Sequence, residues 1–256
     1  MTRATQQAGS FVTRLSAKGA EALCVPALTI EAPSDWSYLD TELHRLNEYK
    51  WLILTSANGV DFFVRRLLTI GYELSILSQV KIAVVGRKTA MRLDSYGISA
   101  DFVPPSFVSE SLIEHFPGKE EMAGAKILYP CLEKDRRELL ISELSKLGAV
   151  VVDVPAYRSS CPPSLPSAVI AMLKQHIDVV TFASPKTVRY FYQLVSQSEA
   201  ALKAKPDELF SKTAIASIGP FTSKTCQAVF GRVDIQPEEY SLIGLENAII
   251  QWALSR

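Results

Sequence analysis

Apolar residues are distributed along the chain with two different spacings. Short apolar runs of about five residues are typical of strands, and between them apolar residues recur every three or four positions, as on one face of a helix. The clearest strand candidates are Leu52–Thr55, Lys81–Val85, Lys126–Pro130, Val179–Ala183 and Ala214–Ile218. Strands that alternate with helices of about twelve residues are typical of parallel sheets covered on both faces. The pattern therefore predicts an α/β fold.

The second half of the chain repeats the first at a nearly constant offset. At an offset of 129 in the numbering, Phe11, Val12, Leu15, Gly19 and Pro26 are matched by Leu140, Ile141, Leu144, Gly148 and Pro155. Ser56 returns as Ser184 at an offset of 128, and Asp101 returns as Asp234 at an offset of 133. Such steady offsets predict an internal duplication, with two similar doubly wound units of five parallel strands each.

The duplication predicts that the first strand of the first unit is short. Lys126–Pro130, shifted back by an offset of 129, corresponds to positions −3 to 1, so either the start site is misassigned or this first strand is stunted. The helix expected over residues 5–18 then needs support from other neighbours. The segment that follows it, Ala22–Ile30, is expected to be a strand that contains Pro26.

The stretch Val150–Ser160 joins the repeated parts of the chain. Its consecutive β-branched residues, followed by Pro155, predict a buried strand that ends at the proline. Tyr157 comes just after this expected end. A phenol at such a junction has two interpretations, an edge aromatic half covered by its neighbours or a catalytic acid. The residue pattern alone leaves both open.

Four predicted strand ends carry small hydroxyl residues beside flexible or cationic neighbours. They are Ser56-Ala57-Asn58, Gly86-Arg87-Lys88-Thr89, Ser184-Pro185-Lys186 and Gly219-Pro220-Phe221-Thr222. Each opens a predicted helix, and a helix N-terminus presents free N–H groups and a partial positive charge that favour anions. Singly, each Ser or Thr is most simply an N-cap. Together the four ends suit a large ligand with several carboxylates or phosphates, although no nucleotide-binding glycine motif is present.

The composition argues against nucleic-acid binding, a membrane span, a disulfide frame and a metal centre. The 27 basic residues balance the 27 acidic ones, so no nucleic-acid partner is expected, and no apolar run reaches the roughly 20 residues that span a bilayer. Four distant cysteines and three scattered histidines predict reduced thiols, without a disulfide frame or a metal centre. Arg3, and the run formed by Lys134, Arg136 and Arg137, have two interpretations, solvated cations or groups that reach a ligand carboxylate.

Seven short motifs occur in an order and at a spacing that together point to a known family. They are Thr2-Arg3, Val25-Pro26, Leu54-Thr55-Ser56-Ala57-Asn58-Gly59-Val60, Ala83-Val84-Val85-Gly86, Val154-Pro155-Ala156-Tyr157-Arg158, Thr181-Phe182-Ala183-Ser184-Pro185 and Ile218-Gly219-Pro220-x-Thr222. Together they resemble the uroporphyrinogen-III synthase family over almost the entire chain. Each motif is weak by itself, and the combination is fairly specific.

The resemblance implies a chain path that the repeat alone does not give. One domain comprises residues 1–31 and 163–256, and the other, residues 36–158, is inserted into it. Two short crossings near residues 32–35 and 159–162 join them, with a substrate cleft between the domains. Short crossings predict a hinge and a variable interdomain angle.

The resemblance also implies a reaction in tetrapyrrole biosynthesis. Linear hydroxymethylbilane loses water, ring D is inverted through a spiro intermediate, and the macrocycle closes to uroporphyrinogen III, without a cofactor or metal. Tyr157 matches the tyrosine expected to donate a proton to the leaving hydroxyl. A phenol with a pKa near 10 carries its proton at working pH, as an acid must.

The strand-end residues become candidates for substrate binding under this resemblance. They are Arg3, Ser56, Ala57, Asn58, Gly86, Arg87, Thr89, Ser184, Pro185, Lys186, Gly219 and Thr222. Among them, Ser56, Thr89, Ser184 and Thr222 match family positions that line the cleft. Phe221 departs from the family, where a smaller or polar residue is common.

The resemblance implies hydroxymethylbilane as the substrate and a transient contact with hydroxymethylbilane synthase. The composition predicts no nucleic-acid or membrane partner, and without an interface pattern in the sequence we expect a monomer. The compartment would be the cytoplasm of a bacterium or the plastid stroma of a plant.

Two other classes of protein are alternatives to an enzyme. A non-catalytic two-lobed protein could bind an anionic ligand, and a tetrapyrrole-linked regulatory module could use the same fold. An extracellular binding protein would need a signal peptide, and a regulatory module commonly carries an effector domain. Neither feature is expected from this sequence.

Overall fold

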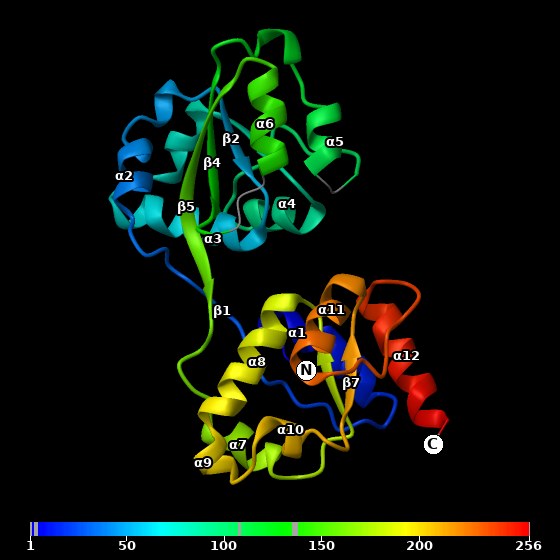
Figure 1. Cartoon of the computed structure of the whole chain (residues 1–256). Helices are drawn as coiled ribbons and strands as arrows, with labels where there is room; N and C mark the ends of the chain where they lie inside the picture. Colours follow the sequence, from blue (N-terminus) through cyan, green and yellow to red (C-terminus); the bar gives the residue numbers. More distant parts are fainter. Residues whose placement is uncertain (1, 3–4, 107–108, 135–137, 256) are drawn as a thin grey trace. The chain divides into compact units, whose positions relative to one another are not determined.

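The chain forms two compact units (Figure 1). The computed structural model describes residues 2, 5–106, 109–134 and 138–255. Unit 1 consists of Met1–Thr29 and Ser160–Arg256, and unit 2 consists of Ile30–Ser159. The chain therefore starts in unit 1, builds unit 2 and returns to unit 1. Both units combine parallel strands with helices, so the fold is α/β.

Unit 2 is built on a mainly parallel five-stranded sheet. Its strands are β1 (Thr29–Glu31), β2 (Trp51–Leu54), β3 (Lys81–Val84), β4 (Lys126–Leu132) and β5 (Val150–Ser160), in the spatial order β1-β5-β4-β2-β3. β2 pairs in parallel with β3 and with β4, and β4 pairs in parallel with β5. All of β2 is buried, because a central strand of such a sheet is covered on both faces.

Helices cover both faces of this sheet (Figure 1). They are α2 (Ser37–Leu43), α3 (Ala57–Thr69), α4 (Arg87–Asp94), α5 (Ser109–Glu114) and α6 (Glu138–Lys146), with short 3-10 turns at Leu46–Glu48, Leu74–Gln79 and Lys119–Glu121. Side chains of α2 and α3 form one apolar cluster with Leu52 and Leu54. Side chains of α5 and α6 form another with Trp51 and Ile53. Successive residues of β2 thus point to opposite clusters, as the alternation along a strand requires.

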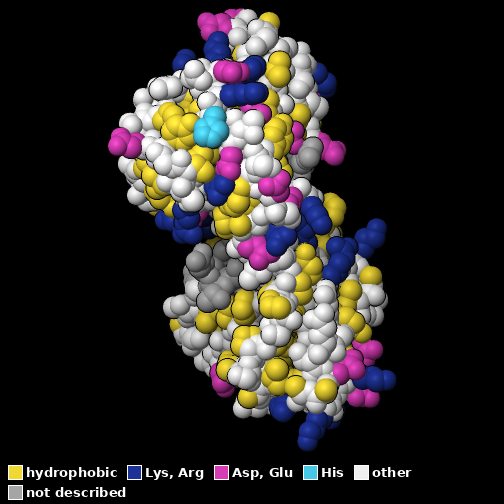
Figure 2. Space-filling model, turned by 90° about the vertical axis from the view of Figure 1, so that its left-hand side faces the viewer, with side chains coloured by type: hydrophobic (Ala, Val, Ile, Leu, Met, Phe, Trp, Pro, Cys, Tyr) yellow, Lys and Arg dark blue, Asp and Glu magenta, His cyan; other side chains and the backbone are white. Residues whose placement is uncertain are grey.

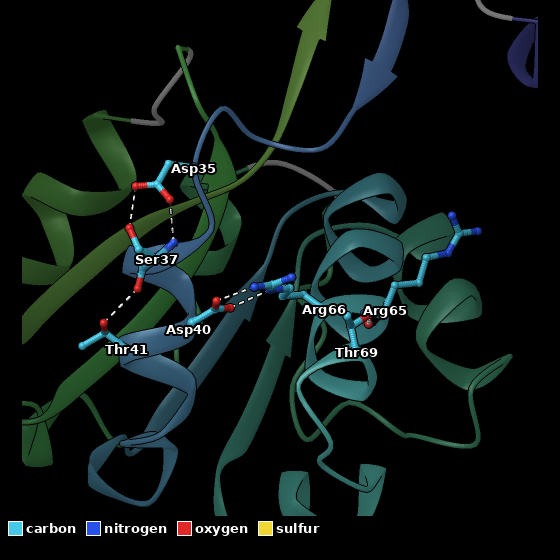
Figure 3. A network of polar contacts seen from close by, with 7 residues as sticks. All are labelled: Asp35, Ser37, Asp40, Thr41, Arg65, Arg66 and Thr69. Atoms are coloured by element: carbon cyan, nitrogen blue, oxygen red, sulfur yellow. Dashed lines mark hydrogen bonds and ion pairs between the residues drawn. The ribbon is translucent and has the colours of Figure 1, made fainter.

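Arg66 of α3 joins α3 to α2 (Figure 3). Its guanidinium donates to both carboxylate oxygens of Asp40, with an Nε–Oδ1 distance of 2.6 Å, and lies over the Trp36 ring at 5.0 Å from its centroid. The hydrogen bond to Asp40 raises the pKa of Arg66. Arg65, the preceding residue, points away from the pair. This contact links α3, which carries the Ser56 cap at its start, to α2.

Unit 1 has a shorter sheet. β6 (Val179–Phe182) and β7 (Ala214–Ser217) pair in parallel. Thr2 lies beside β6, because its N–H donates to the Thr181 carbonyl at 3.4 Å, and its own carbonyl accepts the N–H of Ala27 at 3.2 Å. On the other side of the sheet, Ile235 forms a bridge with Ala216. The order across unit 1 is therefore Ala27, Thr2, β6, β7 and Ile235.

The same order is found in unit 2, with β5, β4, β2, β3 and then Phe102, which bridges Ala83. In both units, an aspartate side chain also bonds the edge strand of the sheet, β3 or β7, near the bridging residue. The Asp101 carboxylate accepts the N–H of Ile82 at 2.7 Å, and the Asp234 carboxylate accepts the N–H of Ile215 at 2.7 Å. Equivalent sequence positions therefore make equivalent bonds.

The helices of unit 1 pack in two apolar clusters. They are α1 (Thr5–Ser16), α7 (Ser167–Leu173), α8 (Pro185–Gln197), α9 (Glu199–Leu202), α10 (Pro206–Leu209), α11 (Pro220–Phe230) and α12 (Leu242–Leu254). One cluster joins α1 to α12 through Phe11 and Ile249. The other joins α7 to α8 and includes Leu173 and Phe191.

The prediction of five regular strands in each unit is wrong for unit 1. Within the described residues, β6 and β7 alone form a ladder there, and the predicted strand Ala22–Ile30 becomes regular only at Thr29. An extended segment forms a regular strand only when a neighbour pairs with it over several residues. Ala27 has Thr2 beside it, and the described chain continues no strand from Thr2 toward Ala22.

The predicted end of the strand at Pro155 is also wrong. β5 continues to Ser160, so Tyr157 lies inside a strand. Pro155 pairs with Cys131, and the register of the β4–β5 ladder shifts between Cys131 and Leu132. Proline lacks the N–H of a regular ladder, and an irregular position in the ladder tolerates that loss.

Charged side chains of both signs are mixed on one face of the molecule. On the face shown in Figure 2, Lys and Arg side chains are interspersed with Asp and Glu in both units. None of the helices in the described part of the chain has both the length and the apolar character needed to cross a membrane.

Candidate functional site

The strand ends of unit 2 bring Ser56 and Tyr157 together. Ser56 follows β2 and is the N-cap of α3, where its Oγ accepts the N–H of Gly59 at 2.9 Å. Tyr157 comes from β5, and its hydroxyl lies 2.8 Å from the Oγ of Ser56, with either oxygen able to donate. The same serine hydroxyl therefore caps a helix and is a hydrogen-bond partner of the phenol.

The ring of Tyr157 has a defined position. It is stacked on Phe62 of α3, with centroids 6.1 Å apart and planes inclined by 14°. Gly59 leaves room for this arrangement, because a Cβ at that position would lie 3.1 Å from Ser56 Oγ and 3.4 Å from Tyr157 Cε1. Only 9% of the tyrosine is exposed. A phenol held in this way presents its hydroxyl in one direction.

Ala57 and Asn58 supply backbone donors at the start of α3. The first N–H groups of α3 that donate hydrogen bonds are those of Gly59 and Val60. Gly59 donates to Ser56 Oγ, and Val60 donates to the Ser56 carbonyl at 3.1 Å. Among the described residues, the N–H groups of Ala57 and Asn58 have no acceptor. Both residues are partly exposed, and unpaired N–H groups at a helix start favour an anion.

The end of β3 provides the neighbouring part of unit 2. Gly86 adopts φ 99° and ψ 143° before α4, a conformation that favours glycine. Thr89 is buried, and its hydroxyl donates to the Val85 carbonyl at 3.0 Å, which leaves the lone pairs of its oxygen available. Arg87 is exposed and has no ion pair with any described residue. Because β3 pairs with β2, these residues and Ser56 follow adjacent strands.

The end of β6 in unit 1 resembles the end of β2. Ser184 caps α8, and its Oγ accepts the N–H of Thr187 at 3.3 Å. Pro185 follows, at a helix position that needs no N–H, and Lys186 is half-buried. The position that corresponds to Tyr157 in this unit is Leu28, which cannot donate a proton. Of these two matched positions, Tyr157 in unit 2 carries a phenol and Leu28 in unit 1 does not.

The end of β7 completes the sequence-predicted set. Gly219 is the N-cap of α11 and has an extended backbone. Glycine at this position avoids a close contact, because a Cβ would lie 3.1 Å from the Tyr240 ring. At Gly86, in contrast, the positive φ favours glycine. Thr222 is buried at 3% exposure, and its hydroxyl makes no hydrogen bond to a described residue. Phe221 is 86% exposed, and Tyr240 is 60% exposed. Because β7 pairs with β6, the Ser184 and Gly219 ends are adjacent.

The structure thus groups the predicted residues by unit. Unit 2 gathers Ser56, Ala57, Asn58, Gly86, Arg87, Thr89 and Tyr157, and unit 1 gathers Ser184, Pro185, Lys186, Gly219 and Thr222. Arg3, Arg136 and Arg137 lie outside the described residues. The sequence analysis missed Phe62 and Tyr240, because stacking on Tyr157 and contact with Gly219 are packing relationships without a local pattern.

All four cysteines lie in the described part of the chain, and none of them forms a disulfide bond. Burial raises the pKa of the Cys226 thiol to about 12, and it also raises the pKa of the Cys161 thiol. In the described part of the chain, no three His, Cys, Asp or Glu side chains form a group that could hold a metal ion. The strand ends described above present hydroxyls, backbone N–H groups and cationic side chains.

Comparisons with known proteins agree on one family. A sequence profile of uroporphyrinogen-III synthase (HemD) matches residues 9–246. The uroporphyrinogen-III synthase of Synechococcus elongatus is 44% identical over 253 residues, which is 98% of this chain and 94% of the relative. That of Chlorobaculum parvum is 27% identical, over 98% of this chain and 97% of the relative.

Solved structures show the same fold. A crystal structure of uroporphyrinogen-III synthetase from Helicobacter pylori gives a TM-score of 0.60 at 16% identity, covering 92% of this chain and 93% of the other. A mutant uroporphyrinogen III synthase from Thermus thermophilus gives 0.58 at 18% identity, covering 98% of this chain and 96% of the other. With the profile and the identity to the Synechococcus enzyme, these matches show that the chain belongs to the uroporphyrinogen-III synthase family.

Proposed function

We propose that Tyr157 and the strand-end residues of both units act on hydroxymethylbilane. The chain is an enzyme of the lyase class, a cyclising hydro-lyase that forms uroporphyrinogen III. The observation that carries this activity is the 44% identity to the Synechococcus enzyme over 98% of the chain. A non-catalytic binding or regulatory protein is not favoured.

Tyr157 donates the proton in the first step of this proposal. The hydroxyl that leaves the substrate takes the phenolic proton and departs as water, while its bonding electrons go with it and leave a cationic pyrrole system. Ser56 Oγ, at 2.8 Å, supports the resulting phenolate by turning its own hydrogen toward it. The phenolate regains a proton when ring closure releases one. Pyrroles expel hydroxide readily, so positioning of the chain ends contributes much of the rate enhancement.

Backbone donors and hydroxyls hold the substrate carboxylates in this proposal. Hydroxymethylbilane carries eight carboxylates, which is more than the nearby cations can match. In unit 2, the N–H groups of Ala57 and Asn58 face no acceptor among the described residues, and Arg87 has no ion pair with any of them. In unit 1, Thr222 offers a buried hydroxyl, and Lys186 offers a cation near Ser184. Helix N-termini bind anions by this combination of N–H groups and partial positive charge.

We also infer an internal duplication and a two-domain organisation. The matched bonds of Asp101 and Asp234, and the equal order of chain segments in the two units, support the duplication. In this proposal, one domain comprises residues 1–31 and 163–256, and the other comprises residues 36–158. The crossings lie near residues 32–35 and 159–162, and both domains contribute to the substrate cleft. The unit boundaries after Thr29 and Ser159 support it.

The remaining partners are part of the same proposal. We infer that the protein acts as a monomer. It contacts hydroxymethylbilane synthase transiently, because linear hydroxymethylbilane closes spontaneously if it is not captured. A cytoplasmic location is inferred from the bacterial origin of the Synechococcus relative. Sedimentation of the purified protein with and without the synthase would test the first two inferences.

The test of the activity is a coupled assay. Freshly prepared hydroxymethylbilane is given to the purified protein, and the uroporphyrin isomers are separated after oxidation. Spontaneous closure gives isomer I, so a dominant isomer III shows both closure and inversion of ring D. Isomer I alone, from protein shown to be folded by circular dichroism, would contradict the proposed function.

A further inference from the structure

A phenylalanine is exposed at the end of β7 in unit 1. Phe221 is the second residue of α11 and is 86% exposed, more than any other large apolar side chain in the described part of the chain. Among the described residues, its ring pairs with no other aromatic ring and belongs to neither apolar cluster of unit 1. The packing of unit 1 therefore does not account for this side chain.

The helix itself gives no reason for an aromatic residue at this position. The first turn of a helix favours acidic side chains and small hydroxyl residues, because free N–H groups and a partial positive charge lie there. Phenylalanine has a moderate helix propensity, and an exposed ring gains no burial. A single exposed apolar residue is common on protein surfaces, so the neighbours of Phe221 are decisive.

The neighbours of Phe221 are a second aromatic ring and polar groups. Tyr240 is largely exposed and lies against the start of the same helix, where a Cβ at Gly219 would be 3.1 Å from its Cγ. Thr222, the next residue, carries a hydroxyl in the first turn of α11. The Ser184 cap of α8 follows β6, the strand that pairs with β7. Exposed aromatic carbon therefore lies at the same strand end as groups that favour an anion.

Unit 2 carries a cation at the equivalent place. At an offset of 133, the segment 219–222 corresponds to the segment 86–89. Both segments have a glycine before the helix and a buried threonine in its first turn. Between these two residues, Phe221 in unit 1 corresponds to Lys88 in unit 2, and both side chains are exposed. The two strand ends therefore offer different contacts, an aromatic ring in unit 1 and a cation in unit 2.

The proposed substrate has two kinds of surface. Each of its four pyrrole rings has an apolar face, and the carboxylates are carried on side chains around these rings. Hydroxyls, N–H groups and cations can hold the carboxylates, but they do not cover the face of a ring. An aromatic side chain does, because flat rings attract one another beyond the effect of the buried area.

We propose that Phe221, with Tyr240 beside it, stacks on one pyrrole ring of hydroxymethylbilane. Thr222 and Ser184 then bind carboxylates of that ring. The contact rests on the proposed function and adds to it a residue that binds and orients the substrate in unit 1. The proton still comes from Tyr157, so Phe221 contributes affinity for the tetrapyrrole and not the rate at which water is released.

The test compares three substitutions at position 221 by steady-state rates of the full chain. Phe221→Ser removes the ring, so KM for hydroxymethylbilane should rise about fivefold to tenfold, the size of one aromatic contact, while kcat stays within about twofold. Phe221→Trp keeps an aromatic face and should keep KM within about twofold of the wild type. Phe221→Leu keeps apolar character without that face, so its KM should lie closer to that of Phe221→Ser.

Leu254→Ser is the matched control. Leu254 is 82% exposed and is the last residue of α12 in the same unit, at the opposite end of that helix from its Ser241 cap. This variant should keep the KM and kcat of the wild type. Both replaced side chains are exposed, so circular dichroism and urea unfolding should give wild-type values for every variant. A change in KM then reports a lost contact with substrate.

A titration with uroporphyrinogen III, freshly prepared and kept without oxygen, measures binding without turnover. This product retains the pyrrole rings and the carboxylates of the substrate. Phe221→Ser should therefore raise its Kd about fivefold to tenfold relative to the wild type and to Leu254→Ser.

Three results would overturn the proposal. Equal KM and Kd values for Phe221→Ser and Leu254→Ser, beside a wild type that makes isomer III, would exclude the ring contact and leave the proposed function standing. Equal KM values for Phe221→Leu and Phe221→Trp would show that no aromatic face is used. Isomer I alone from the folded wild type would contradict the proposed function, and the contact assigned to Phe221 would fall with it.

Discussion

The hydroxyl of Tyr157 lies 2.8 Å from Oγ of Ser56, across a separation of 101 residues in sequence. The serine oxygen also accepts the N–H of Gly59, so the start of α3 and the phenol share one hydroxyl group. Phe62, one turn further along α3, stacks on the same ring. The helix therefore positions the phenol at two points, and a change at Ser56 acts on both the helix and the phenol.

Tyr157→Phe should lower the rate of uroporphyrinogen III formation by about tenfold to a hundredfold, within the range of general acid catalysis. The ring and its contact with Phe62 remain, whereas the phenolic proton and the bond to Ser56 are lost. We expect kcat to fall with KM nearly unchanged, because the phenol acts on the leaving hydroxyl and not on the carboxylates. Steady-state rates over a range of hydroxymethylbilane concentrations measure both constants.

Tyr72→Phe is the matched control for this change. It removes a phenol hydroxyl that bonds His44 Nδ1 at 2.8 Å on the exposed surface of the same unit. This variant should retain the wild-type rate. A rate for Tyr157→Phe equal to that of Tyr72→Phe would remove the phenol from the mechanism, while leaving the enzyme activity established.

Ser56→Ala and Ser241→Ala separate the two roles of the serine at position 56. Each variant loses an N-cap bond of 2.9 Å, from Gly59 N–H and from Gly244 N–H respectively, at a cost of about 1 kcal/mol in the free energy of unfolding. Only Ser56 also bonds Tyr157. We therefore expect similar losses of stability in urea, with a fall in kcat for Ser56→Ala alone. Equal kcat values in the two variants would show that Ser56 serves only as a cap.

The sequence analysis predicted the repeat and the strand ends because these depend on local composition. Strand, hydroxyl and helix follow one another within a few residues at Ser56 and at Ser184, and both serines are N-caps in the structure. The matched aspartates at positions 101 and 234 also make the same backbone bond. Features that depend on neighbours in sequence are visible without the fold.

Features that depend on neighbours in space were not visible. Tyr157 was expected beyond a strand, yet β4 and β5 continue to pair past Pro155 through a register shift. Residues 22–28 have strand-like composition, yet no regular strand is assigned to them, and within the described part of the chain Ala27 makes a ladder-like bond, to the Thr2 carbonyl. The asymmetry between Tyr157 and Leu28 is present in the sequence, but its meaning depends on the contact with Ser56.

Gly219→Ala should destabilise the protein by about 1–3 kcal/mol, because its Cβ would lie 3.1 Å from Cγ and 3.3 Å from Cβ of Tyr240. These atoms lie near the root of the tyrosine side chain and cannot swing away freely. Tyr240→Ala should relieve most of this cost, since Tyr240 is 60% exposed and contributes little burial. A double-mutant cycle in urea measures the coupling.

Gly86→Ala provides the contrast. It should cost about 1–3 kcal/mol through its positive φ of 99°, and Tyr240→Ala should not relieve that cost. Additive effects of Gly219→Ala and Tyr240→Ala would show that the ring does not enforce glycine at position 219.

The buried thiol of Cys226 should make stability fall with rising pH above about 9. Burial raises its pKa from 9.0 to about 12, so between these values the unfolded thiol ionises and the folded thiol does not. The unfolded state then binds fewer protons, which lowers the free energy of unfolding as pH rises. For this one group, the unfolding equilibrium constant changes by at most about tenfold per pH unit.

Cys226→Ala removes this contribution and isolates it from other groups that titrate in alkali. Urea unfolding of both proteins at pH 8, 9 and 10 should show a stability difference that changes steadily above pH 9, with the wild type losing more. Cys24→Ala, at a partly exposed thiol, serves as the control substitution. In native protein at pH 8, a thiol reagent should label Cys24 before Cys226. A stability difference between the wild type and Cys226→Ala that stays constant from pH 8 to pH 10 would contradict the raised pKa of this thiol.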